Sequence, residues 1–363
     1  MTVLITFSVS MSVQGSQSDS KGLRSYMQMQ ILSLTKKAIL KPLKLPHAAR
    51  IELQSLGAII RNGFPDIMLQ FLGGIGDELL LTSVAHELRK RDPHLRIWQV
   101  SHSAELLYNN PDYSRVFNWN YWPLRYSQFL NKKRLQLSYA KQIIAGEKEI
   151  PPDEHIITAL CRKAGLSGNV SLKPYFFMSG KEKSEGRLAK RQIAVQCVGP
   201  DSYNNVMQYK LWDKWKFQTV VNLINDGTIG DSHIEIIQLG NEKDPLLQDV
   251  LDVRGKTSIR LTAAILSNCE CFIGTSGFLK HLARAVECRS VIIYGGREHS
   301  YQSGYISNEN LNSFIECAPC WRWNSCTYNR RCMEMIMPED VLKGVKRILG
   351  KRDVPLETEI GLI

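Results

Sequence analysis

The chain has 363 residues, of which 44% are hydrophobic, and this is enough apolar material for two hydrophobic cores. No run of about 18 uninterrupted apolar residues occurs, so the sequence predicts no transmembrane helix. The formal charge of +11 favours anionic partners, among them nucleic acid, lipid headgroups and phosphorylated substrates, without choosing among them.

Residues 1–65 are expected to form a basic, partly flexible extension. The start, MTVLITFSVSMSV, lacks the basic region that opens a secretory signal, and we expect it to be disordered. From Lys21 to Arg61 basic and apolar residues are interleaved, with Glu52 as the only acid. This pattern is typical of a helix that lies on an anionic membrane surface. A helical extension packed on the main body explains it equally well.

An alternation of apolar strands and amphipathic helices begins at residue 66. Residues 119–150 are aromatic and basic without a clear strand pattern, and we expect helices there that shape one wall of a cleft. The alternation is typical of a parallel sheet with helices on both faces, so residues 66–180 are predicted to form one Rossmann-like domain. Strands are predicted at 67–72, 97–102 and 115–118, and helices at 77–90, 105–108 and 155–164.

The same alternation restarts after a charged, polar stretch at 179–192, which is a candidate linker. Residues 181–349 are therefore predicted to form a second Rossmann-like domain, followed by a tail at 350–363. The fold class is α/β, with two doubly wound domains that face each other across a cleft. Strands are predicted at 193–198, 234–239, 271–273 and 290–294, and helices at 212–225, 258–267, 278–286 and 338–349.

The first glycine loop, Gly73 to Gly76, precedes a helix that starts with two carboxylates, Asp77 and Glu78. The dinucleotide-binding pattern requires a third glycine where this chain has Leu79, so an NAD-dependent oxidoreductase is disfavoured. A helix N-terminus stabilises an ionised carboxylate. We therefore expect Asp77 to be charged at neutral pH and able to accept a proton from a hydroxyl group. The alternative is a capping acid without chemistry.

A second glycine loop, Gly274-Thr275-Ser276-Gly277, follows a buried strand and opens a helix without acids in its first turn. Small residues let a ligand approach the free N–H groups at a helix start, which is typical of a phosphate site. His281 lies about one turn further along this helix. Lys210 and Glu242 follow two other predicted strands at the same sheet edge, where they could neutralise a phosphate and bind ribose hydroxyls.

The order of these motifs resembles glycosyltransferase family 9, the ADP-heptose:lipopolysaccharide heptosyltransferases and their relatives. The resemblance covers roughly residues 66–349. Each motif is loose, but their order and spacing together are specific. The matching stretches are Gly76-Asp77-x-Leu79-Leu80-x-Thr82, Asn110-Pro111, Lys210-x-Trp212, Arg254-Gly255-Lys256-Thr257-Ser258 and Thr275-Ser276-Gly277-x-x-x-His281-Leu282-Ala283.

This resemblance implies a GT-B fold and an inverting sugar transfer from a nucleotide-diphosphate sugar without a catalytic metal. It implies Asp77 as general base in the first domain and Glu242 as the ribose ligand. It also implies an ADP-sugar or GDP-sugar donor, and a cell-surface glycan such as lipopolysaccharide or a lipid-linked saccharide as acceptor, or alternatively a protein side chain. The enzyme would work in the cytoplasm or peripherally at the inner membrane. The implied donor-phosphate ligands are Lys210, Thr275, Ser276, Gly277 and His281.

One departure from the family pattern stands at Thr275, where an aspartate is usual. It leaves the donor sugar and the nucleotide base open. It also keeps a non-catalytic scaffold of the same fold as an alternative. Because Asp77, Lys210 and His281 are all present, activity is the favoured interpretation.

Four of the nine cysteines are crowded into one stretch, CAPCWRWNSCTYNRRC. Their thiolates could hold one structural zinc or iron ion. The alternatives are two local disulfides, or reduced thiols packed beside Trp321 and Trp323. The other five cysteines lie in or beside apolar stretches, as buried thiols of a reducing compartment do. The candidate metal ligands are Cys317, Cys320, Cys326 and Cys332.

The basic charge, the C-x2-C spacing and the nearby aromatic residues also suggest a nucleic-acid-binding module. The basic residues are spread along the chain, however, and no recognisable nucleic-acid motif accompanies them. The sequence therefore favours the transferase over this alternative.

Overall fold

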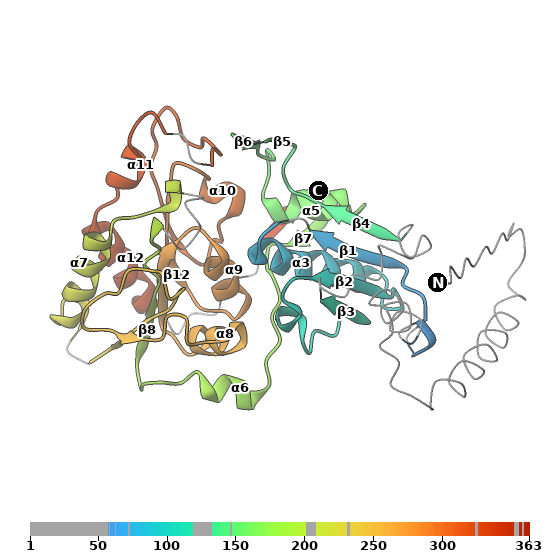
Figure 1. The fold of residues 1–363 in the computed structure, drawn as a ribbon, viewed down its shortest axis with the longest axis horizontal. Helices are drawn as coiled ribbons and strands as arrows, with labels where there is room; N and C mark the ends of the chain where they lie inside the picture. The colour runs from blue at the N-terminus through green and yellow to red at the C-terminus, as the bar shows by residue number, and fades with distance from the viewer. Residues whose placement is uncertain are drawn as a thin grey trace, which may run out of the picture. The chain divides into compact units, whose positions relative to one another are not determined.

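The computed structural model (Figure 1) describes residues 57, 59–61, 63–71, 73–118, 133–145, 147–200, 208–230, 233–323, 326–351, 356–357 and 359–363. Almost all of the predicted basic extension lies outside the described residues, as do residues 119–132 of the predicted cleft wall. No helix in the described part of the chain is long and apolar enough to cross a bilayer.

A four-stranded parallel sheet organises the first half, in the order β3-β2-β1-β4. Helices α3 and α5 pack against each other beside this sheet. The predicted strands and helices of residues 66–118 are confirmed, with shifts of one or two residues at their ends. The elements are β1 (Ile67–Phe71), α3 (Ile75–Arg91), β2 (Ile97–Ser101), η1 (Ala104–Leu107), β3 (Arg115–Asn118), β4 (Arg134–Leu137) and α5 (Ile156–Lys163).

A six-stranded parallel sheet organises the second half, in the order β10-β9-β8-β11-β12-β13. Its strands are β8 (Gln192–Val195), β9 (Glu235–Gln238), β10 (Leu251–Asp252), β11 (Cys271–Thr275), β12 (Ser290–Gly295) and β13 (Glu309–Asn312). Its helices are α6 (Gly180–Glu185), η5 (Gln208–Lys210), α7 (Lys214–Asn225), α8 (Ile259–Ser267), α9 (Phe278–Ala285), α10 (Ser300–Ser303), α11 (Arg331–Glu334) and α12 (Pro338–Gly350). The predicted α/β class is confirmed by the two parallel sheets.

Residues 133–150 differ from the prediction of helices. Strand β4 joins the edge of the first sheet beside β1, and the strands β5 (Gln142–Ile144) and β6 (Lys148–Ile150) form an antiparallel hairpin. Edge strands and hairpins are half exposed, so they lack the continuous apolar run by which a central strand is recognised.

The candidate linker at 179–192 contains helix α6, which has no buried residue but contacts α8. Ser179 caps α6 by accepting the Glu182 N–H. At the end of α6, a Cβ on Gly186 would stand 2.0 Å from the Ala264 carbonyl carbon, so only glycine lets this segment lie against α8.

The chain crosses between the halves in both directions. The outgoing segment runs through Leu172 to Met178, and the C-terminal segment returns to the first half. There the strand β14 (Ile360–Leu362) pairs antiparallel with β7 (Asn169–Ser171), so the C terminus lies beside first-half elements in Figure 1. The predicted tail therefore contains a strand.

The two halves share apolar contacts. Leu79 of α3 and Phe176 of the outgoing segment belong to one buried cluster with Leu282 of α9. Tyr305 and Trp321 of the second half are buried in the core of the first half. This shared packing fixes the facing edges of the two sheets, where the candidate site lies.

Candidate functional site

The starts of α3 and α9 meet face to face between the two sheets (Figure 1). Gly76 lies at the contact. A Cβ at this position would stand 3.4 Å from the Phe278 Cα and 3.7 Å from the His281 Cδ2. Each helix follows the carboxyl end of a parallel strand, which is where ligands bind in doubly wound sheets. The two glycine loops found in the sequence are thus brought together.

Asp77 is the partly buried carboxylate of this contact. The Gly74 N–H donates to Asp77 Oδ2 at 2.9 Å, and the Tyr139 hydroxyl is a second hydrogen-bond partner. Burial raises the pKa of Asp77 to about 6; Glu149 adds to the rise, while the Gly74 bond and Lys210 oppose it. At neutral pH Asp77 is therefore ionised yet basic enough to take a proton.

Glu78, the second carboxylate, is fully buried and structural. The Ser101 hydroxyl donates to it at 2.5 Å, and His102 donates its backbone N–H at 2.8 Å. It therefore ties α3 to the end of β2. Leu79, where a dinucleotide loop would need its third glycine, is also fully buried. Neither position leaves room for a pyrophosphate at the α3 start.

A cavity of about 370 Å³ opens beside this contact. Ile75 of α3 and Phe278 of α9 line one side, and Gly240, Asn241 and Thr257 line the side formed by the loops after β9 and β10. Its mixture of apolar walls and loop polar groups suits a nucleoside. None of the predicted ligands belongs to this lining, and Glu242 is exposed.

The predicted phosphate ligands lie close together near the α9 start, but two are already occupied. Lys210 Nζ lies 2.7 Å from Glu298 Oε1, and the Ser276 hydroxyl donates to the same oxygen at 2.6 Å. Thr275 is buried at the end of β11, and Gly277 is the N-cap residue of α9. The departure at Thr275 therefore leaves no charge at this strand end.

His281 is buried against Tyr305, with its Nδ1 2.5 Å from the tyrosine hydroxyl. Burial lowers the pKa of His281 well below its usual value, and the nearby Lys280 lowers it further. The ring is thus neutral at physiological pH. It can offer a hydrogen bond to a ligand but brings no positive charge to a phosphate.

Several charged residues of the site escaped prediction from the sequence. Lys280 and Glu298 are buried beside Lys210, and Arg297 pairs with Glu149 of β6 at 3.2 Å. One signal was available: Gly295-Gly296 follows the buried strand β12 at the same sheet edge as the second glycine loop. It marks a third loop at the site and carries Arg297 and Glu298.

The four clustered cysteines are free thiols near one another. Gly296 makes room for them: a Cβ there would stand 2.8 Å from the Cys332 Sγ, and the Cys320 N–H donates to the Gly296 carbonyl. Burial raises the pKa of Cys332 to about 11, and Cys320 and Cys326 add to the rise. Within the described residues, no three metal-binding side chains are arranged to hold an ion. The expected metal site stays a prediction.

The remaining cysteines behave as predicted for packed thiols. Cys161, Cys197, Cys271 and Cys288 are buried, and Cys269 is partly buried. Burial raises the pKa of the thiols of Cys161, Cys197 and Cys269 to about 12, so they stay protonated and unreactive.

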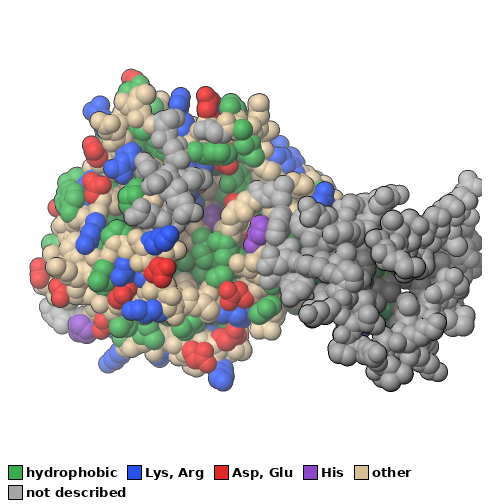
Figure 2. All heavy atoms as spheres, in the orientation of Figure 1, with side chains coloured by type: hydrophobic (Ala, Val, Ile, Leu, Met, Phe, Trp, Pro, Cys, Tyr) green, Lys and Arg blue, Asp and Glu red, His purple; other side chains and the backbone are tan. Residues whose placement is uncertain are grey.

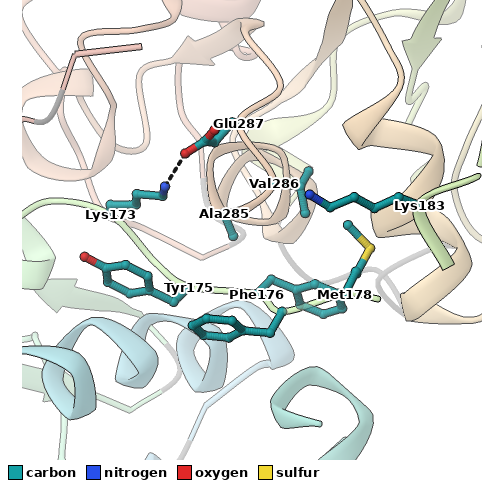
Figure 3. A pocket seen from close by; sticks show the side chains of 9 residues that line it. Lys173, Tyr175, Phe176, Met178, Lys183, Ala285, Val286 and Glu287 are labelled. Carbon is teal, nitrogen blue, oxygen red and sulfur yellow. Dashed lines mark hydrogen bonds and ion pairs between the residues drawn. The ribbon is translucent and has the colours of Figure 1, made fainter. Parts of the chain in front are cut away.

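A second cavity, of about 220 Å³, lies where the outgoing segment passes the end of α9 (Figure 3). Lys173 pairs with Glu287 at its rim at 2.5 Å, and Tyr175, Phe176 and Met178 line the opposite wall. It holds no candidate catalytic group, so we assign it to the crossing rather than to the site.

Charged side chains of both signs are interspersed over the face in view in Figure 2, and hydrophobic side chains gather toward its middle. On the described part of this face, Lys and Arg do not collect into a single patch. A nucleic-acid surface would require such a patch.

Two Rossmann-like halves that face each other are the arrangement of the GT-B fold. ADP-heptose LPS heptosyltransferase II of Escherichia coli shares the fold with a TM-score of 0.59 at 13% identity, over 79% of this chain and 100% of that one. The iron-containing dodecameric glycosyltransferase TibC of enterotoxigenic E. coli has a TM-score of 0.60 at 13% identity, over 78% of this chain and 76% of that one. A family 9 glycosyltransferase of Veillonella parvula has a TM-score of 0.56 at 13% identity, over 79% of this chain and 98% of that one. The predicted GT-B fold is confirmed.

Residues 179–328 match the sequence model of glycosyltransferase family 9, described as heptosyltransferase. Lipooligosaccharide heptosyltransferase 2 of Campylobacter jejuni is 25% identical over 118 residues, which are 32% of this chain and 36% of that protein. The match thus spans about a third of the length of this curated relative. The resemblance to family 9 found in the motifs is confirmed, and the second half of the chain carries the family's sequence pattern.

Proposed function

We propose that this protein transfers a sugar from a nucleoside-diphosphate sugar to a cell-surface glycan such as lipopolysaccharide or a lipid-linked saccharide. The observation that carries the proposal is the contact at Gly76, where α3 brings a basic carboxylate and α9 brings an acid-free helix start beside one cavity. A base and an anion site on opposite sides of a cleft are what glycosyl transfer to a hydroxyl requires.

In the proposed reaction Asp77 takes the proton from the acceptor hydroxyl while its oxygen attacks the anomeric carbon. The bond from that carbon to the diphosphate breaks, and attack from the opposite face inverts the anomeric configuration. Lys210 and the N–H groups at the α9 start stabilise the charge on the departing diphosphate, which supports catalysis without a metal ion.

An ADP-sugar is the favoured donor, with a GDP-sugar second. The support comes from TibC, whose structure was solved in complex with ADP-D-beta-D-heptose and shares the fold at a TM-score of 0.60. Asn241 and Thr257 in the cavity wall offer polar contacts to a nucleoside. Glu242 stays the proposed ribose ligand, and it follows Asn241 of the cavity wall in the sequence.

The test is a thermal-shift titration of the full chain with ADP, GDP, UDP, CDP and NAD. A ligand at 100 times its dissociation constant adds about 2.7 kcal/mol of stability. We expect a selective response to one nucleoside diphosphate. A response to NAD alone, or to none of the five, would overturn the proposal.

The second step compares the natural chain with Asp77→Ala. The variant should keep the nucleotide response and lose about 10²–10⁴ in transfer rate. Equal turnover by the two proteins would remove Asp77 from the mechanism. Nucleotide binding without any transfer by the natural chain would instead identify a non-catalytic scaffold.

We also propose that Cys317, Cys320, Cys326 and Cys332 hold a structural zinc or iron ion. Four thiolates are the donor set that these metals prefer, and an all-cysteine site leaves no open position for catalysis. The convergence of Cys320 and Cys332 at Gly296 supports the proposal. When bound, the ion would brace the loop between β13 and α11.

A further inference from the structure

Glu298 is a buried carboxylate, only 6% exposed, on the third loop of the site. The loop follows β12, and it brings Glu298 beneath the glycine loop that precedes α9. Every residue that contacts its two oxygens is itself part of the site or adjoins it. The proposed reaction assigns no step to this carboxylate.

The contacts divide between the two oxygens. Oε1 lies 2.7 Å from Lys210 Nζ and accepts the Ser276 hydroxyl at 2.6 Å. Oε2 accepts the Ser303 hydroxyl at 2.6 Å and lies 3.6 Å from Lys280 Nζ. Both partners of Oε1 are therefore groups proposed above as ligands of the donor phosphates.

The charge of Glu298 is secured by its neighbours. Burial alone would raise its pKa, but Lys210, Lys280 and Arg297 together hold it well below the usual range. Burial lowers the pKa of Lys280 to about 8, so this lysine is still largely charged at neutral pH. A buried carboxylate with paired cations on both oxygens is strongly held in place.

We infer that in the free protein the Glu298 carboxylate binds Lys210 and Ser276, the same groups that bind the diphosphate of the nucleotide sugar. The incoming diphosphate then displaces the carboxylate from Lys210. Glu298 is thus a positioning residue that acts through Lys210 and Ser276. It keeps the Lys210 ammonium group and the Ser276 hydroxyl oriented while no ligand is bound. This inference rests on the proposed function, because it assumes that Lys210 and Ser276 meet a phosphate.

One consequence concerns affinity. A diphosphate must spend part of its binding free energy on displacing the carboxylate. Once bound, its negative charges lie close to the negative charge of Glu298 and are repelled by it. The nucleoside makes neither contact. Removing the carboxylate should therefore strengthen the binding of a nucleoside diphosphate while leaving that of the nucleoside unchanged.

The experiment is isothermal titration of the full chain with ADP and with adenosine, or with the diphosphate and nucleoside selected by the thermal-shift screen. Glu298→Gln should bind the diphosphate about tenfold more tightly than the natural chain does, with unchanged nucleoside affinity. In transfer assays the donor KM should fall together with kcat, because the product diphosphate leaves more slowly.

Two further variants complete the design. Glu298→Asp keeps the charge but has a shorter side chain, which moves the charge away from Lys210. It should tighten diphosphate binding by a smaller factor than Glu298→Gln does. If Glu298→Gln does not fold, this variant replaces it in the test. The matched control is Glu87→Gln, which removes a carboxylate that is 1% exposed and accepts the Ser171 N–H away from the site. It should leave both affinities unchanged.

The outcomes separate the inference from the proposed function. Unchanged or weaker diphosphate binding by both Glu298 variants would overturn the inference, as would equal changes for diphosphate and nucleoside, which a merely structural role produces. If the natural chain binds no nucleoside diphosphate, the proposed function fails and this inference fails with it.

Discussion

Adjacent carboxylates at the start of α3 have opposite environments. Glu78 accepts hydrogen bonds from Ser101 and His102 and is fully buried. Asp77 accepts the Gly74 N–H, but its burial raises its pKa. Replacing the carboxylate by an amide should therefore raise stability and abolish transfer at Asp77. The same change at Glu78 should lower stability and leave transfer unchanged.

At the residue scale, Asp77→Asn should stabilise the protein while abolishing transfer. Burial raises the pKa of Asp77 from 3.8 to about 6, so the folded state ionises it at a free-energy cost that is complete above pH 6 and absent below about pH 4. The variant should gain about 1–3 kcal/mol of unfolding free energy at pH 7.5. Denaturant titrations at pH 7.5 and pH 4 measure the gain, and an equal gain at both would contradict the cause.

Glu78→Gln is the matched opposite. It removes the buried charge to which the Ser101 hydroxyl and the His102 N–H donate, and should lower the unfolding free energy by about 2–4 kcal/mol. Because Glu78 lies on the β2 side of α3 rather than at the cavity, kcat of the folded protein should be unchanged. Loss of kcat in a chain with native circular dichroism would show that Glu78 acts in the reaction.

The pH dependence of the reaction tests the same carboxylate in a different way. A base must be ionised, so kcat/KM should rise about tenfold per pH unit below pH 6 and level off above it. Initial rates from pH 4.5 to 8 with saturating acceptor give the profile. An apparent pKa near 4 would indicate either a different base or an Asp77 that is solvated when substrate is bound.

At the scale of elements, the cysteine loop, which carries Cys317, Cys320 and Cys326 between β13 and α11, connects the second half to Asp77, the proposed base. The Trp321 indole N–H donates to Gln302 at 2.8 Å, and its ring lies edge-on to Tyr139, 6.2 Å between centroids. Tyr139 in turn hydrogen-bonds Asp77. The Glu149 N–H donates to the Trp321 carbonyl, so the loop also holds the hairpin of β5 and β6. A change in this loop should therefore alter the surroundings of Asp77.

Metal analysis of the purified chain tests the proposed cysteine site. We expect about one zinc or iron ion per chain, because four thiolates complete one tetrahedral site. Cys320→Ser and Cys332→Ser should each remove the metal and lower the melting temperature. Cys288→Ser, at a buried thiol far from this loop in sequence, is the control and should keep it. A metal-free natural chain with normal stability would rule out the structural ion.

Prediction from sequence succeeded where an element is decided by its own residues. β1 follows from its apolar run and α9 from helical periodicity, and the loops before α3 and α9 follow from glycine and small residues. The hairpin of β5 and β6 was missed because its strands are short and half exposed, and its hydrogen bonds with Trp321 and Trp323 form only in the folded chain. The contacts of Glu298 were missed as well, since Lys210, Ser276 and Lys280 lie well before it in the sequence and only the folded chain brings them together.

At the scale of the whole molecule, the returning C-terminal segment is bonded to the outgoing one. The Leu172 N–H donates to the Glu359 carbonyl at 2.8 Å, and the Ile363 N–H donates to the Gly168 carbonyl at 3.0 Å. Glu359 also accepts the Ile306 N–H from the second half at 2.8 Å. The segment therefore ties the two halves as well as completing the small sheet of β7 and β14.

Deleting residues 359–363 should lower the melting temperature and speed amide exchange at Val170 and Leu172, because β7 loses its partner strand. Mass-spectrometric hydrogen exchange locates the effect. Leu362→Ser, at a side chain that is 76% exposed, is the control and should change the stability by less than about 0.5 kcal/mol. Unaltered exchange in the deletion would mean that β14 contributes no protection.

The pairing of Ile360 with Ser171 also means that β7 meets its partner strand only at the end of protein synthesis. The ribosome makes the entire second half between these two partners. While the chain is still being synthesised, β7 has an open edge that invites pairing with other nascent chains. The first half can finish folding only after its last strand has emerged, so a translational stall within the second half would release an aggregation-prone fragment rather than a stable domain.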